Sequence, residues 1–139
     1  MTTPPRSFAD TNVFIALLLG PEHSLHAQAL DLFRRVAFRD LDLVLSPVVV
    51  AELVHYLRKT AGWSRAEIGE QLSALLAADG IVVMEARTVE RSLDLYAETA
   101  RLDYPDAWLA AAALEAGDGA VASFDKDFDR IPGVRRIAA

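Results

Sequence analysis

The 139-residue sequence contains no cysteine. This absence excludes disulfides, thiolate zinc sites, iron–sulfur clusters and thiol nucleophiles, so His, Asp and Glu are the strong metal ligands that remain. The longest apolar stretches, 13–19 and 107–114, fall short of the roughly 20 residues that a membrane-spanning helix requires. The first stretch also lacks the basic flank and the cleavage pattern of a signal peptide. We therefore expect no membrane span and a cytoplasmic protein.

Lysine is scarce, because only Lys59 and Lys126 interrupt a basic set that is otherwise arginine. Twenty acidic residues outnumber 14 basic residues, and the net charge of -6 argues against binding nucleic acid through a broad basic surface. A nuclease is not excluded, since divalent cations on carboxylates invert the local charge and can hold a phosphate. Three basic pairs could contact phosphates, although solvated helix faces or a terminal strand explain any single pair better: 34–35, 58–59 and 135–136.

Apolar periodicity continues from Phe8 to Ile137 without a linker or a repeat, which predicts a single domain over residues 1–139. Short strands are expected at 6–9, 41–45, 81–84, 120–123 and 135–138. Helices are expected at 13–19, 25–36, 47–60, 65–76, 88–102 and 106–116. Ser46-Pro47 and the Ser64/Glu67 capping box mark two helix starts, and Tyr104-Pro105 reads as a break.

Short apolar strands that alternate with helices predict an α/β fold, with a central and mostly parallel sheet between two helical layers. Function collects at the carboxyl ends of the strands in such folds. Asp10 follows the first strand and Asp125 follows the fourth, so the two ends can be neighbours. Glu52 interrupts an otherwise apolar helix, and Asp106 begins a helix that continues in apolar residues.

Three of these acids also have a purely structural explanation. Glu52 is harder to explain in that way, because a carboxylate is costly to bury without a partner. Asp10 fits a cap, Asp106 fits a helix N-terminus, and Asp125 fits a polar loop. If the four converge, they raise one another's pKa unless a divalent cation neutralises them. A ligand set made only of oxygen favours Mg²⁺ or Mn²⁺.

Four segments together resemble the acidic motifs of PIN-domain nucleases. They are Asp10-Thr11-Asn12, Ser46 followed six residues later by Glu52, the 106–110 segment DAWLA and the 123–128 segment SFDKDF. The resemblance runs from Phe8 to Ile137, and the length and spacing look like the toxin subunit of the VapBC toxin–antitoxin class. A three-layer PIN-like fold is what this resemblance implies.

The resemblance also implies a set of roles, in which Asp10, Glu52, Asp106 and Asp125 hold the metal. Asp127 could replace Asp125 as the fourth acid. Residues that could support the site by orienting ligands or water are Thr11, Asn12, Ser46, Asp103 and Asp127. The implied protein is an endoribonuclease that uses Mg²⁺, with Mn²⁺ as a substitute, together with an antitoxin partner and a homodimeric state. Attack by metal-activated water predicts 5′-phosphate and 3′-hydroxyl ends.

Two other readings stay open on the residues alone. The first is a Mg²⁺-dependent phosphohydrolase of small molecules, although the turn after Asp10 lacks the second Asp of haloacid dehalogenase enzymes and the sequence has no Gly-rich phosphate loop. The second is a noncatalytic binding module whose acids are structural. The Glu52-x-x-His55 pair resembles a di-iron motif, but such bundles use that motif twice and it occurs once here.

Overall fold

Three short strands form a parallel sheet with β2 at its centre. In the computed structural model, which describes residues 3–138, β2 (Asp42–Leu45) pairs with β1 (Arg6–Phe8) on one side and with β3 (Ile81–Val83) on the other. All four residues of β2 are buried, whereas β1 is an edge strand whose Phe8 side chain is 72% exposed. The sheet and its helices confirm the α/β class expected from the sequence.

The helices begin close to the residues that the capping signals mark. They are α1 (Thr11–Leu18), the 3₁₀ turn η1 (Gly20–Glu22), α2 (His26–Ala37), α3 (Pro47–Lys59), α4 (Arg65–Leu76), α5 (Ala86–Glu98) and α6 (Tyr104–Ala116). Ser46 caps α3 by accepting the backbone N–H of Val49, and Ser64 and Glu67 form the complete capping box of α4. No helix in the described part of the chain is long and apolar enough to cross a membrane.

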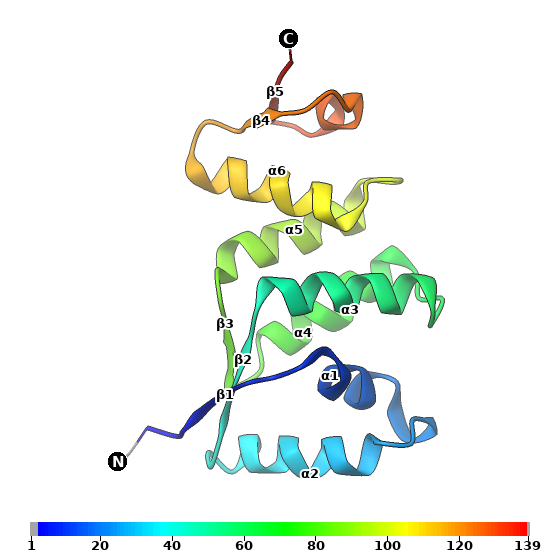
Figure 1. Ribbon diagram of the computed structural model, residues 1–139, viewed down its shortest axis with the longest axis vertical. Helices are drawn as coiled ribbons and strands as arrows, with labels where there is room; N and C mark the ends of the chain where they lie inside the picture. Colours follow the sequence, from blue (N-terminus) through cyan, green and yellow to red (C-terminus); the bar gives the residue numbers. More distant parts are fainter. Residues whose placement is uncertain (1–2, 139) are drawn as a thin grey trace.

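The C-terminal strands form a second sheet instead of extending the first. β4 (Ala120–Ala122) pairs in parallel with β5 (Arg135–Ile137), and the 3₁₀ helix η2 (Lys126–Arg130) connects them. Both strands lie beyond α6, toward the C-terminal end of the long axis (Figure 1). Because β1 and β4 belong to different sheets, strand pairing does not bring their carboxyl ends together as expected.

Gly119 explains why β4 turns back along α6. Its φ is +67°, its backbone N–H donates to the carbonyl of Ala113, and its own carbonyl accepts from Arg135. A Cβ at this position would collide with the carbonyl oxygen of Gly133. The close approach of these two glycines therefore fixes where β5 meets β4.

Helix α5 ends at Glu98, earlier than the expected residue 102, because Arg65 takes over the exposed backbone carbonyls. Its Nη1 donates to the carbonyls of Tyr96, Thr99 and Leu102 at 3.1, 3.3 and 2.6 Å. The guanidinium carbon also lies 4.3 Å from the centroid of the Tyr96 ring. This contact joins the start of α4 to the end of α5. Local sequence patterns could not predict it, because the residues it joins are more than 30 positions apart in the sequence.

Helix α6 includes Tyr104 and Pro105 in its first turn, so the break expected there is wrong. Proline is tolerated at this position because the first N–H groups of a helix have no partner within the helix. The buried Tyr104 hydroxyl lies 2.7 Å from the Ser92 hydroxyl, which itself donates to the carbonyl of Val89. Burial raises the pKa of Tyr104 to about 12, although the hydrogen bond to Ser92 acts to lower it. This buried contact fixes the start of α6 on α5.

Candidate active site

The first pair of acids lies where β1 ends and α3 passes. Asp10 caps α1, because its Oδ1 accepts the backbone N–H of Thr11 at 2.7 Å. The hydroxyl of the buried Thr11 donates to Glu52 Oε2 at 2.6 Å. Thr11 therefore connects the turn after β1 to the middle of α3.

Glu52 is exposed, which corrects the expectation that its surroundings are apolar on all sides. Its neighbours Leu53 and Val54 point into the core, and Glu52 lies on the opposite face of α3. Asp10, Asn12 and Glu52 line one open cavity of about 620 Å³, together with Pro105 of α6. The carboxylates thus face an open cavity that a ligand can enter.

The second group of acids surrounds Asp106 near the start of α6. Partial burial raises the pKa of Asp106, and the charges of Asp125, Asp103 and Asp127 raise it further, in that order of size. The structure therefore brings Asp106 and Asp125 within electrostatic reach of each other. An uncompensated group of this kind is stabilised by a bound cation.

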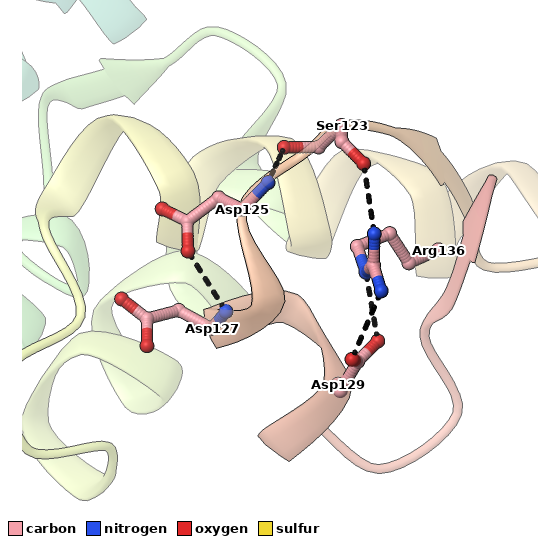
Figure 2. A network of polar contacts seen from close by, with 5 residues as sticks. All are labelled: Ser123, Asp125, Asp127, Asp129 and Arg136. Atoms are coloured by element: carbon pink, nitrogen blue, oxygen red, sulfur yellow. Dashed lines mark hydrogen bonds and ion pairs between the residues drawn. The ribbon is translucent and has the colours of Figure 1, made fainter. Parts of the chain in front are cut away.

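The loop after β4 presents Asp125 (Figure 2). Its backbone N–H donates to the Ser123 hydroxyl at 3.0 Å, and its Oδ1 accepts the N–H of Asp127 at 2.8 Å. On the other side of the loop, Arg136 donates to both oxygens of Asp129 and to the carbonyl of Ser123. Arg136 therefore braces the loop without neutralising Asp125.

The ion pairs of residues 3–138 leave the four motif acids without a cationic partner. These pairs join Asp31, Glu115, Asp127 and Asp129 to arginines. Asp127 Oδ1 lies 3.5 Å from Arg130 Nη2, whereas Asp125 makes no such contact. Of the two candidates for the fourth acid, Asp125 is thus the one whose charge is free.

The supporting candidates occupy different positions around these acids. Asn12 lines the cavity with Asp10, whereas Ser46 caps α3 and directs its hydroxyl to the helix backbone. Asp103 precedes α6 and makes no capping bond. Sequence reasoning missed the buried hydrogen bond between Tyr104 and Ser92. The available signal was that Ser92 is a polar residue on the otherwise apolar face of α5.

The sequence model of the PIN domain matches residues 7–134. The chain belongs to the PIN-domain family. PIN domains are generally nucleases and typically act with divalent metal ions. Comparison with the curated proteins gives no match.

The donor set of this PIN domain suits a divalent cation, because Asp10, Glu52, Asp106 and Asp125 offer carboxylate oxygens that no arginine or lysine occupies in the described chain. Within residues 3–138, however, no three His, Asp or Glu side chains are grouped closely enough to hold an ion. The acids stand as two groups, one at the N-terminus of α1 and on α3, and one on α6 and the loop after β4.

Proposed function

We propose that this PIN domain is a Mg²⁺-dependent endoribonuclease and the VapC-type toxin of a toxin–antitoxin pair. The supporting observation is the set of four carboxylates without cationic partners, at motif positions within the matched residues 7–134. We assign Asp10, Glu52, Asp106 and Asp125 as the metal-binding and catalytic acids. The proposal places the enzyme with its RNA substrate in the cytoplasm.

The proposed roles of the protein groups follow from their contacts. Thr11 keeps Glu52 beside Asp10 through its 2.6 Å hydrogen bond, and Asn12 offers an amide to ligands in the same cavity. Ser123 and the backbone of residue 127 hold Asp125 at the end of β4. Asp103 and Asp127 add negative charge around Asp106, which strengthens cation binding there.

Mg²⁺, or Mn²⁺ in its place, would supply a lowered pKa for the attacking water and charge stabilisation for the leaving oxygen. In this proposal, Asp10, Glu52, Asp106 and Asp125 would hold the cation, whose charge would relieve the repulsion around Asp106. Pro105, the residue before Asp106, already lines the cavity of Asp10 and Glu52, so the first turn of α6 borders the first pair of acids.

An antitoxin and a second copy of the chain are the proposed partners. The acids without cationic partners and the net charge of -6 complement a basic antitoxin segment. An arginine from such a segment would compete with the metal for the same carboxylates. Added Mg²⁺ should then weaken the toxin–antitoxin complex.

The first test is cleavage of total RNA by the purified protein, in Mg²⁺ and in chelator, with the new RNA ends mapped. We expect metal-dependent cleavage that leaves 5′-phosphates and is lost in Asp10→Asn. Asp40→Asn is the matched control, because Asp40 is an exposed carboxylate on the turn between α2 and β2.

Cyclic-phosphate ends would contradict attack by water, because they result from attack by the ribose 2′-hydroxyl. No cleavage of any RNA pool by the folded, antitoxin-free protein would contradict the ribonuclease assignment. Hydrolysis of small phosphomonoesters under those conditions would instead support a phosphohydrolase.

A further inference from the structure

A second cleft, of about 410 Å³, adjoins the cavity of Asp10 along α3. Its wall carries a concentration of basic groups in a chain whose net charge is -6. His55, Arg58 and Lys59 come from α3, and Arg65 comes from the start of α4. The single carboxylate among its lining residues is Asp103. We call this cleft, with these five residues, the basic cleft.

The basic cleft and the acidic cavity share part of their lining. Ala51 and His55 of α3 and Pro105 of α6 line both spaces. A chain-like ligand that lies over the acids can therefore continue into the basic cleft without leaving the surface. This continuity connects the position of the proposed chemistry to a position of opposite charge.

The positive charge of the basic cleft is available to a ligand. Arg58 Nη1 donates to the carbonyl of Trp63 at 3.1 Å, and Arg65 donates to three backbone carbonyls. Neutral carbonyls orient these guanidinium groups but leave their charge uncompensated. Neither they nor the exposed Lys59 form an ion pair with a carboxylate of residues 3–138.

We propose that the basic cleft binds the sugar–phosphate backbone of RNA next to the phosphodiester that is cleaved. The inference rests on the proposed function and extends it to the substrate contacts. Arginine and lysine are the side chains suited to phosphate, and a strand with one phosphate at the acids must carry further phosphates along the adjoining surface. The acids repel those neighbouring phosphates, and the basic cleft offsets that repulsion.

The test measures binding separately from cleavage, in Asp10→Asn protein with a fluorescent single-stranded RNA of mixed sequence. Adding Arg58→Ala and Lys59→Ala should weaken binding by about tenfold and should lower the slope of log K against log salt by roughly 1.4, the value for two phosphate contacts on a single strand. Arg34→Ala with Arg35→Ala is the matched control. Both pairs occupy the last turn of a helix, but Arg34 and Arg35 do not line either space.

The chemistry of the ligand is tested with an RNA whose linkages are neutral methylphosphonates. If the basic cleft contacts phosphate charge, replacing Arg58 and Lys59 should no longer change the affinity for this RNA. A persistent effect would overturn the proposal, as would equal losses in the matched control. Lys59→Gln alone guards the test against misfolding. The side chain is exposed, so the variant should keep the helix and still weaken binding through the loss of one charge.

The outcomes separate this inference from the proposed function. Cleavage by the wild-type chain with no change of affinity in the Arg58 and Lys59 variants would overturn the basic cleft and leave the ribonuclease standing. Salt-dependent loss of binding in a chain that cleaves no RNA would support the basic cleft and overturn the ribonuclease. Preferential binding of an acidic peptide by the same residues, with no binding of RNA, would overturn the proposal in favour of a protein partner.

Discussion

Thr11 is the residue through which the two first acids are held in relation to each other. Its backbone N–H donates to Asp10 and its hydroxyl donates to Glu52, at 2.7 and 2.6 Å. A hydrogen bond to a charged group contributes about 1.5–3 kcal/mol, so this side chain restrains Glu52 despite the exposure of the carboxylate. The position therefore links a helix cap to the proposed chemistry.

Thr11→Val should lower kcat for RNA cleavage by about tenfold, because it removes the hydroxyl and leaves Glu52 free to rotate. Thr11→Ser should stay close to the wild type, since it keeps the donor. Steady-state cleavage kinetics with a defined RNA would measure the difference. Equal rates in the valine and serine variants would show that the hydrogen bond does not position Glu52.

Asp106 gives a prediction of opposite sign for stability and for activity. Burial and neighbouring carboxylates raise the pKa of Asp106 in the folded protein. Its contribution to folding stability is therefore fully present below the pKa of Asp106 in the unfolded chain, and is lost as pH rises through the raised pKa of the folded protein. Asp106→Asn should therefore raise the midpoint of thermal unfolding at pH 7, by roughly 2 °C, while it abolishes cleavage.

Thermal unfolding at pH 7 and at pH 3 checks the origin of this effect. The gain should disappear at pH 3, where the wild-type carboxyl is protonated in both states. At pH 7, Mg²⁺ should stabilise the wild-type chain more than Asp106→Asn. An unchanged or lower midpoint in the variant at pH 7 would contradict the repulsion around Asp106.

At the level of elements, the connection from α6 to β4 determines where Asp125 is presented. Gly119 has a φ of +67° and approaches the backbone of Gly133, so β4 and β5 meet at two positions that lack side chains. Arg136 then fixes the loop from β5, through Asp129 and the Ser123 carbonyl. The placement of Asp125 thus depends on contacts made after the strand itself.

Gly119→Ala should destabilise the protein by more than Gly62→Ala. Both positions have a positive φ, at +67° and +73°, but a Cβ at Gly62 meets nothing within 4 Å. We expect the free energy of unfolding to fall by about 1 kcal/mol in Gly62→Ala, from the strained φ alone, and by about 2–4 kcal/mol in Gly119→Ala, where the new Cβ also collides with the backbone of Gly133. Urea unfolding of the two variants measures the difference, and similar values would show that the glycine contact is unimportant.

Much of the element order could be predicted from the sequence, because caps and apolar spacing are local. Ser46-Pro47 and the Ser64/Glu67 box fixed two helix starts within a residue. The end of α5 could not be predicted, since Arg65, at the start of another helix, donates the hydrogen bonds to the backbone carbonyls there. The outward direction of Glu52 also escaped prediction, because its apolar neighbours hid which face of α3 is buried.

At the scale of the whole molecule, the partner of each strand was the feature that the sequence did not specify. β4 and β5 are three residues each, too short for an alternating pattern to identify a neighbour. The four acids were predicted from their positions relative to the elements and stay a prediction as a site, although Asp106 and Asp125 do lie within electrostatic reach of each other. Their relation to Asp10 and Glu52 depends on how α6 lies over α3, which is a property of packing and not of local sequence.

The separation of the two groups of acids also orders them in time. Chains are made from the N-terminus, so Thr11 and Glu52 can meet once α3 exists, whereas Asp106 and Asp125 follow on α6 and after β4. A growing chain therefore carries half of the proposed site until α6, β4 and the loop after β4 are made. Under the proposed function, a ribosome is exposed to the complete set of acids only after Asp125 has been added, and a product truncated before residue 125 should not cleave RNA.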